Sequence, residues 1–131
     1  MRRVEHGREI LDGPTPAPDR AASLADVERL NAWFGGHALT VRHVARALRS
    51  VPPARPVRIL DVGAGAGHLA VRLVRWARAA GRPIRVIALD RDIGPARAAT
   101  RSYPEIAVLS GDAAALPVRP GAVDLVVSSL V

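Results

Sequence analysis

The stretch RILDVGAGAGHLAVRLVRWA, residues 58–77, holds the strongest structural signal in this chain of 131 residues. It begins with the apolar run of a buried parallel strand and ends with apolar residues at helical spacing. Between the two, Gly63, Gly65 and Gly67 stand at every second position. Glycine has no Cβ, so a ligand can approach this backbone closely, and the N-terminus of the helix offers unpaired N–H groups. The stretch therefore predicts a strand, a ligand-binding turn and a helix.

From residue 57 onward, strand patterns alternate with helix patterns. The helix predicted over 68–80 ends at Gly81, a typical C-terminal cap, and Pro83 prevents its continuation. Strands that alternate with helices imply right-handed crossovers and a parallel sheet. We therefore expect an α/β fold with a doubly wound, Rossmann-like parallel sheet that is incomplete, with about four strands. The predicted strands are 57–62, 84–90, 106–112 and 123–131, and a short helix is expected within 93–103.

The residues before the sheet fall into two predicted parts. Closely spaced prolines in the segment 1–22 exclude a helix, so we expect a flexible, proline-rich arm. Residues 23–51 show two helical patterns, separated by Gly35 and Gly36, and predict an N-terminal helical cap. The sheet is thus expected to follow two N-terminal helices.

The composition excludes several kinds of chemistry. All 19 basic residues are arginine, and the chain has no cysteine. Without lysine there is no Schiff base and no phosphate-loop lysine, and without cysteine there is no disulfide, thiolate nucleophile or cysteine-bound metal. No apolar run reaches the ~18 residues of a membrane span, and the N-terminus lacks the apolar core of a signal peptide. We expect a soluble, cytoplasmic protein that contacts no membrane.

The net charge of +7 leaves two interpretations open. An arginine excess is typical of proteins that bind nucleic acid. The arginines are spread evenly along the chain, however, which favours a bias in composition over a binding surface. A nucleic-acid partner is therefore not expected, and a basic, non-catalytic nucleic-acid-binding module is kept as an alternative.

The spacing of the glycines separates two classes of nucleotide ligand. A dinucleotide site has the pattern G-x-G-x-x-G, and counting from Gly63 the sixth position is His68. The pattern here is D-x-G-x-G-x-G, which begins at Asp61. A carboxylate at that place repels a pyrophosphate and attracts a cationic ligand. An NAD(P)-binding Rossmann oxidoreductase fragment is thus the disfavoured alternative.

Four segments, in sequence order, resemble the motifs of class I S-adenosylmethionine-dependent methyltransferases. They are ILDVGAGAGHLA (59–70), VIALDRD (86–92), LSGDAAALPV (109–118) and VDLVVSSLV (123–131). The last resembles the fourth strand of the quinone-biosynthesis-like and small-molecule subgroups. The resemblance covers residues 57–131, about the first half of that family's catalytic domain. It implies a methyltransferase whose cofactor is S-adenosyl-L-methionine.

The resemblance also implies a role for each acid at the end of a strand. Asp61 would orient the methionine ammonium, Asp90 would accept hydrogen bonds from the ribose hydroxyls, and Asp112 would accept one from the adenine amine. Ile93 and Leu116 would flank the adenine ring. The full set of implied cofactor-binding residues is Asp61, Gly63, Ala64, Gly65, Gly67, Asp90, Arg91, Asp112, Ala113 and Ser128.

Each acid also has a simpler interpretation. Asp61 can cap the end of a strand, Asp90 can be a surface acid paired with Arg91, and Asp112 can be a turn residue. No metal site is expected, because the histidines at 37 and 43 are six residues apart and do not share a helical face. The sequence assigns no catalytic base.

The end of the fourth strand bears on the methyl acceptor. Family members that methylate the amino groups of nucleobases carry a proline-and-aromatic motif there, whereas this chain has Ser128-Ser129-Leu130-Val131. The sequence therefore favours transfer to oxygen or carbon of a small molecule. The family's sheet has seven strands, so residues 57–131 are expected to be the cofactor-binding half of the domain, truncated after strand four. Such a half is expected to bind the cofactor weakly or not at all, and to be inactive alone.

Overall fold

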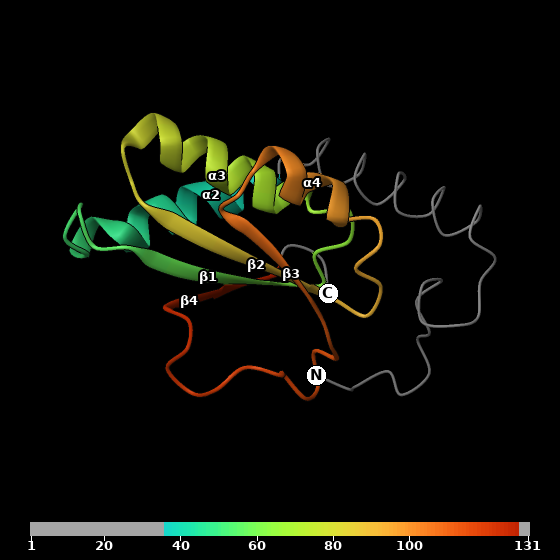
Figure 1. Ribbon diagram of the computed structural model, residues 1–131. Helices are drawn as coiled ribbons and strands as arrows, with labels where there is room; N and C mark the ends of the chain where they lie inside the picture. The colour runs from blue at the N-terminus through green and yellow to red at the C-terminus, as the bar shows by residue number, and fades with distance from the viewer. Residues whose placement is uncertain (1–35, 129–131) are drawn as a thin grey trace.

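The computed structural model of the protein describes residues 36–128 (Figure 1). The predicted arm over 1–22, the first helix of the predicted cap and residues 129–131 of the predicted fourth strand lie outside the described residues. The boundaries of the three predicted parts of the chain therefore stay predictions.

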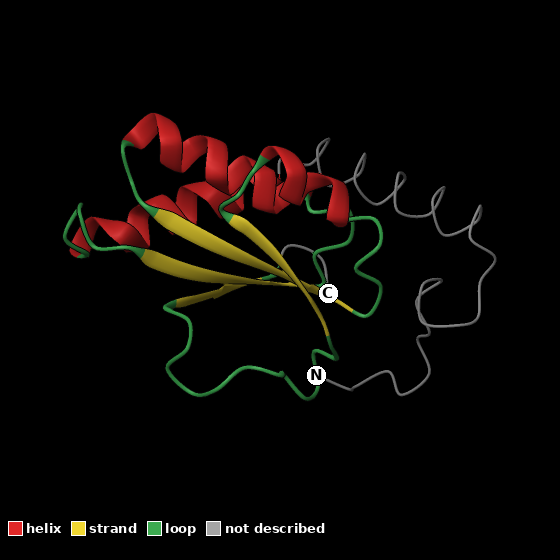
Figure 2. Cartoon of the chain, viewed as in Figure 1, coloured by secondary structure: helices red, strands yellow, loops and turns green. Residues whose placement is uncertain are grey.

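The centre of the fold is a parallel sheet of four strands (Figure 2). These are β1 (Val57–Val62), β2 (Ile84–Asp90), β3 (Ile106–Ser110) and β4 (Leu125–Val127). Their order across the sheet is β3-β2-β1-β4, so β1 pairs with β2 on one side and with β4 on the other. Asp61 lies beside Ala88 of β2 and Val127 of β4 in this register. The predicted Rossmann-like α/β fold is confirmed.

The described helices cover one face of the sheet (Figure 1). They are α2 (Gly36–Ala47), the 3-10 turn η2 (Leu48–Ser50), α3 (His68–Ala80) and α4 (Arg97–Ser102). The segment 111–124 runs along the other face, and its apolar side chains pack there. None of the helices in the described part of the chain has the length and apolar character needed to cross a membrane.

Two apolar clusters hold these layers together. The larger one lies between the helices and the sheet and includes Ile59 and Leu73, both fully buried. The smaller one lies on the opposite face and includes Leu60 and Leu89, and Val118 of the segment 111–124 packs against this cluster. Neighbouring residues of a strand point to opposite faces, and every residue of β1 except Arg58 is buried, so both faces of this strand are covered.

Helix α3 begins and ends at glycines, as the sequence predicts. Gly67 precedes its first residue with a φ of 82°, and Gly81 follows its last residue with a φ of 66°. The N–H of Arg82 then donates to the carbonyl five residues earlier at 2.8 Å, which completes a Schellman cap. The guanidinium of Arg82 donates to the carbonyls of Leu48 and Val51 at 3.1 and 3.2 Å. The end of α3 therefore holds η2 in place.

Two strands are shorter than predicted, and side chains account for both differences. Strand β3 ends two residues early because Asp112 directs its carboxylate to a backbone N–H two residues later and turns the chain. Strand β4 begins two residues late, at Leu125. Directly before it, Asp124 accepts a hydrogen bond from the N–H of Arg58 at 2.8 Å and one from Arg55 at 2.9 Å. This acid fixes where β4 joins β1.

Candidate functional site

The carboxyl ends of the strands bring together the acids that the sequence predicts for the site. Asp61 lies near the end of β1, Asp90 ends β2, Asp112 follows β3 and Ser128 follows β4. The chain adds β2 and β3 on one side of β1 and then crosses to add β4 on the other side. Such a switch point, at the carboxyl ends of the strands, is where open α/β sheets bind ligands. The fold therefore defines a candidate ligand-binding edge.

The turn between β1 and α3 requires glycine at three positions. Gly63, Gly65 and Gly67 have φ values of 71°, 56° and 82°, in the left-handed region that L side chains disfavour. The N–H groups of Gly63 and Ala64 both donate to the carbonyl of Leu89, at 2.9 and 3.0 Å. The turn is therefore fixed against the end of β2, and its only side chains are the methyl groups of two alanines. A ligand can approach such a backbone closely.

Asp61 is the buried acid of this edge. Asp61 is only 1% exposed, and it interacts with neighbouring groups of the protein. It lies two residues before the first glycine of the turn. A buried carboxyl group next to that turn suits a ligand with a positive group, which would stabilise its charged form. The role predicted for Asp61 toward an ammonium group is consistent with this position and stays a prediction.

Asp90 joins the end of β2 to the glycine turn. Its Oδ2 atom accepts the N–H of Gly65 at 2.9 Å, and its Oδ1 atom accepts the N–H of Asp92 at 3.1 Å. The simpler interpretation, a surface acid paired with Arg91, does not account for these two backbone bonds. Each carboxylate oxygen has two lone pairs, so Asp90 can accept further hydrogen bonds from a ligand with hydroxyl donors.

Asp112 forms a turn and also an ion pair. Its Oδ1 atom accepts the N–H of Ala114 at 2.9 Å, and its Oδ2 atom lies 3.5 Å from Nη2 of Arg91. The Ala114 N–H and, after it, the charge of Arg91 hold the pKa of Asp112 below its ordinary value. Asp112 can therefore be a turn residue and also an acceptor for a ligand. Its carboxylate is ionised, and a ligand donor can take the place of Arg91.

The remaining predicted residues have different surroundings. Ser128 donates its hydroxyl to the carbonyl of Val62 at 3.0 Å, which places the end of β4 beside the start of the glycine turn. Ala113 and Leu116 are exposed in the segment after β3, whereas Ile93 is half-buried in the segment after β2. These positions leave Leu116 accessible to a ligand.

One contact at this edge is not predicted from the sequence. A Cβ on Gly111 would lie 2.7 Å from Cγ and 2.9 Å from Cδ of Pro117, so the backbone of Gly111 packs directly against the proline ring. The N–H of Gly111 also donates to the carbonyl of Asp90 at 3.1 Å. Gly111 therefore positions the segment that carries Asp112. Its signal in the sequence is weak, since it is a single glycine followed six residues later by a proline.

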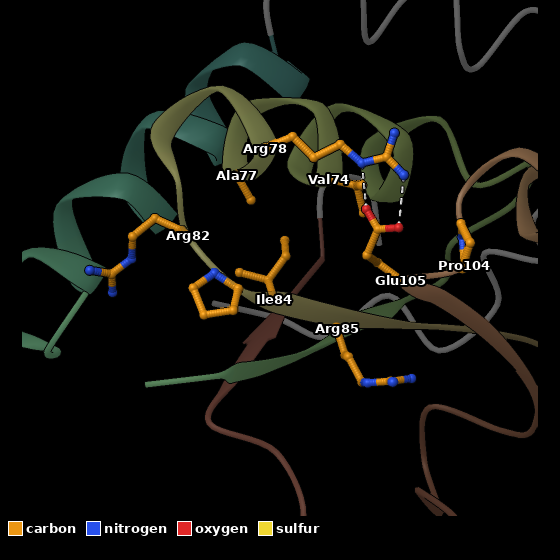
Figure 3. Close-up of a pocket in the computed structure, with 9 residues that line it drawn as sticks. Val74, Ala77, Arg78, Arg82, Ile84, Arg85, Pro104 and Glu105 are labelled. Atoms are coloured by element: carbon orange, nitrogen blue, oxygen red, sulfur yellow. Dashed lines mark hydrogen bonds and ion pairs between the residues drawn. The ribbon is translucent and has the colours of Figure 1, made fainter. Parts of the chain in front are cut away.

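A cavity of about 370 Å³ lies at the opposite end of the sheet (Figure 3). Its apolar lining includes Ala77 of α3 and Ile84 at the start of β2, and on one side Arg78 donates two hydrogen bonds to Glu105, at 2.7 and 2.8 Å. This cavity is at the amino ends of β2 and β3. It is therefore separate from the glycine turn and from the acids of the candidate edge.

No group of three or more His, Cys, Asp or Glu side chains within residues 36–128 is arranged to hold a metal ion. Within these residues, the candidate edge consists of acidic side chains and backbone groups.

Comparison with known proteins identifies the family. Residues 59–131, more than half of the chain, match the family described as "Methyltransferase domain". The matched region contains the glycine turn, all four strand ends and every residue of the predicted site. The chain belongs to this methyltransferase family. Among curated protein sequences, none matches the chain.

Two solved structures share the fold of this chain. The CMeT domain of the citrinin polyketide synthase matches with a TM-score of 0.54 at 22% identity, over 64% of this chain and 23% of that one. A Methanococcus maripaludis protein, assigned as an S-adenosyl-L-methionine-dependent methyltransferase, matches with a TM-score of 0.58 at 18% identity. That match covers 93% of this chain and 53% of the other. At these identities the likeness shows the fold, and the chain spans about half or less of each of these proteins.

Proposed function

We propose that this protein takes part in S-adenosyl-L-methionine-dependent methyl transfer and that the carboxyl edge of its sheet holds the cofactor. The observation that carries the proposal is the 2.9 Å bond between the Asp90 carboxylate and the N–H of Gly65. This bond joins an acid to a turn that has few side-chain atoms, and both lie at the switch point of the sheet. The chain belongs to the methyltransferase family. A ribose, with two hydroxyl donors, suits that acceptor.

The residues at this edge fit the cofactor in chemical terms. The turn over 63–67 carries no side chain larger than a methyl group, so it can lie against the methionine and ribose portions. Asp61 supplies negative charge for the ammonium, and Asp112 supplies an acceptor for the adenine amine. When bound, the cofactor supplies an electrophilic methyl group on a sulfonium. The contribution of this chain is to bind the cofactor and to orient it.

We assign the methyl acceptor to the class of small molecules that accept at oxygen or carbon. The support is the sequence after β4, in which two serines, a leucine and a valine replace the proline-and-aromatic motif of nucleobase amino methyltransferases. Ser128 uses its hydroxyl to bind the carbonyl of Val62, so it ties β4 to the turn. We assign the catalytic base to no residue of this chain.

A binding comparison tests the cofactor assignment. Binding of the 131-residue chain is expected to be weak, so equilibrium dialysis is run at a protein concentration high enough to detect weak binding. Dialysis against S-adenosylhomocysteine, and separately against NADPH, should show retention of the first ligand only. Asp90→Ala should lower that retention at least tenfold, because it removes the ribose acceptor and the bond that holds Gly65. Arg119→Ala, a change of an exposed residue in the segment 111–124, serves as the control and should bind as the wild type does.

Preferential retention of NADPH would contradict the assignment and support a dinucleotide-binding enzyme. Equal retention of S-adenosylhomocysteine by the wild type and Asp90→Ala would contradict the role of Asp90 itself.

One observation favours a second candidate function, binding to nucleic acid. The described helices and η2 carry exposed arginines and no acidic residue. These arginines are Arg42, Arg46, Arg49, Arg72, Arg75, Arg78, Arg97 and Arg101. Duplex RNA should then bind with an affinity that falls steeply as salt is raised, and Asp90→Ala should bind it as well as the wild type does. The methyltransferase proposal instead requires Asp90→Ala to bind S-adenosylhomocysteine more weakly than the wild type does.

A further inference from the structure

The acidic residues of this chain are distributed unevenly, although its arginines are not. Residues 1–35 carry five arginines and six acidic residues, whereas residues 36–131 carry fourteen arginines and again six acidic residues. The excess of positive charge therefore belongs entirely to the part of the chain that follows residue 35.

The acidic residues among 36–128 all lie outside the helices. They are Asp61, Asp90, Asp92 and Asp112 at the carboxyl edge, Glu105 before β3 and Asp124 before β4. The helices α2, α3 and α4 and the turn η2 hold eight exposed arginines and no acidic residue. A bias that replaces lysine by arginine does not remove acids from helices, so composition alone does not explain this arrangement.

Five of these arginines form two rows on neighbouring helices. Arg42, Arg46 and Arg49 recur at intervals of four and three residues along α2 and η2, and Arg72 and Arg75 are three residues apart on α3. Residues at such intervals lie on the same side of a helix, and the buried residues of α2 and α3 lie on the other side. Since α2 and α3 are in contact, the rows lie next to each other and point away from the sheet. We call these five residues the arginine face.

The arginine face has no counter-charge in the described part of the chain. None of its five guanidinium groups forms an ion pair or a hydrogen bond within residues 36–128. Arg78, by contrast, is paired with Glu105 at 2.7 Å. Like charges three or four residues apart on a helix repel each other and destabilise it. An anionic partner that covers the face would remove this repulsion.

The chemistry of the arginine face favours phosphates of a nucleic acid over a lipid bilayer. A planar guanidinium matches two phosphate oxygens at once. Binding to a bilayer surface also needs apolar side chains that insert into it. Of the large apolar residues that are exposed among 36–128, only Leu39 lies on a helix. Duplex nucleic acid presents rows of phosphates and requires no such insertion.

We propose that the arginine face binds the phosphate backbone of duplex nucleic acid and is a second binding surface, separate from the cofactor edge. The face lies on the outer side of the helices that cover one face of the sheet, whereas the acids of the cofactor edge lie at the ends of the strands (Figure 1). Nucleic-acid binding thus accompanies the site proposed for methyl transfer and does not depend on it. Contacts to phosphates alone carry little sequence preference.

Two double variants test where the duplex binds. Arg46→Gln/Arg75→Gln removes one charge from each row. Arg85→Gln/Arg119→Gln, the matched control, removes two exposed arginines from the opposite side of the sheet, since Arg85 lies between two strand residues of the helix-side cluster. Fluorescence anisotropy with a labelled duplex DNA, repeated over a range of salt concentrations, measures the affinity of each protein.

The salt dependence counts the phosphates that are bound. For the wild type, the logarithm of the affinity should fall with the logarithm of the salt concentration with a slope of about −4 or steeper. In Arg46→Gln/Arg75→Gln the slope should be shallower by about two, and the affinity at low salt should fall roughly tenfold or more. The control variant should keep the slope of the wild type.

A thermal melt and a second ligand complete the test. Arg46→Gln/Arg75→Gln should unfold at the temperature of the wild type or above it, because glutamine suits a helix and the repulsion within each row is relieved. A loss of duplex binding is then not a loss of fold. Excess S-adenosylhomocysteine should leave the affinity of the wild type for the duplex unchanged.

Four outcomes would overturn the inference. Equal losses of affinity in the two double variants would mean that net charge, and not this face, attracts the duplex. Binding of polyglutamate as tightly as the duplex would mean that any polyanion suffices. Binding of anionic phospholipid vesicles without binding of the duplex would assign the face to a membrane, and displacement of the duplex by S-adenosylhomocysteine would place it at the cofactor edge. A wild type that binds the duplex and not S-adenosylhomocysteine would contradict only the proposed function.

Discussion

Asp90 joins two parts of the backbone that are far apart in the sequence. Its carboxylate accepts the N–H of Gly65, which lies 25 residues before it. The acid itself is predictable from the sequence, since it ends a strand. Its bond to the glycine turn is not, because the bond depends on β2 lying directly beside β1 in a parallel register. At this scale the candidate site is a backbone turn held by a side chain.

Gly67 offers a test of the glycine turn. Gly67→Ala should lower the free energy of unfolding by about 1–2 kcal/mol, because alanine at a φ of 82° is strained. It should also weaken S-adenosylhomocysteine binding, since a relaxed turn moves the backbone of the site. Urea unfolding and ligand titration measure the two effects.

Gly81→Ala is the matched control for that change. Gly81 has a φ of 66°, open space around it and a place at the far end of α3. It should therefore lose a similar amount of stability and keep the affinity for the ligand. Equal losses of affinity in the two variants would mean that the turn has no special part in binding.

Gly111 tests how the segment after β3 is positioned. In Gly111→Ala the new methyl group meets the ring of Pro117 at 2.7–2.9 Å, so the backbone must shift. We expect a loss of about 1–3 kcal/mol in unfolding free energy, as for other overpacked sites, and weaker binding of S-adenosylhomocysteine as Asp112 moves. Chemical denaturation and titration with S-adenosylhomocysteine check this. Unchanged stability would show that the segment adapts and that Gly111 does not position it.

At the scale of elements, Asp124 sets the start of β4. It accepts the N–H of Arg58 from β1, and its own N–H donates to the carbonyl of Arg58 at 2.8 Å. The bond from the Arg58 N–H, followed by the charge and hydrogen bond of Arg55, holds the pKa of Asp124 below its ordinary value. The acid therefore links the stability of the β1–β4 pair to pH.

The pH dependence of Asp124→Asn follows from that lowered pKa. A carboxyl whose pKa is lower in the folded state stabilises the fold above its ordinary pKa of about 3.9 and loses this effect as the pH falls through the lowered value. Asparagine does not titrate. The wild type should thus be more stable than Asp124→Asn at pH 7, and the difference should shrink below about pH 4. Urea unfolding across this range measures it, and a constant difference down to pH 2 would contradict the assignment.

At the scale of the whole molecule, the alternating patterns predict the parallel sheet and its helices well. Residues 57–62 and 68–80 are a strand and a helix within the predicted bounds. The side of the sheet on which each helix lies is not predictable from the pattern alone. The doubly wound arrangement was expected, and the helices among residues 36–128 all lie on one face, with the segment 111–124 on the other.

In the candidate site, features that depend on neighbouring residues could be predicted, whereas contacts between distant residues could not. The glycines and the acids at strand ends are local features, and the sequence predicts where they meet. The ion pair between Arg91 and Asp112 joins residues 21 apart, and the contact of Gly111 with Pro117 depends on how a loop folds back. Neither has a periodic pattern, so neither could be predicted.

Cofactor binding at the carboxyl edge of the sheet can be tested by an NMR titration. Amide shifts of the ¹⁵N-labelled 131-residue chain would be followed as S-adenosylhomocysteine is added, a method that detects weak binding as well as tight binding. We predict saturable shifts at residues 63–67, 90–92 and 112–116. Shifts confined to the arginine-bearing helices, or to the cavity beside Arg78 and Glu105, or no shifts at millimolar ligand, would contradict the claim.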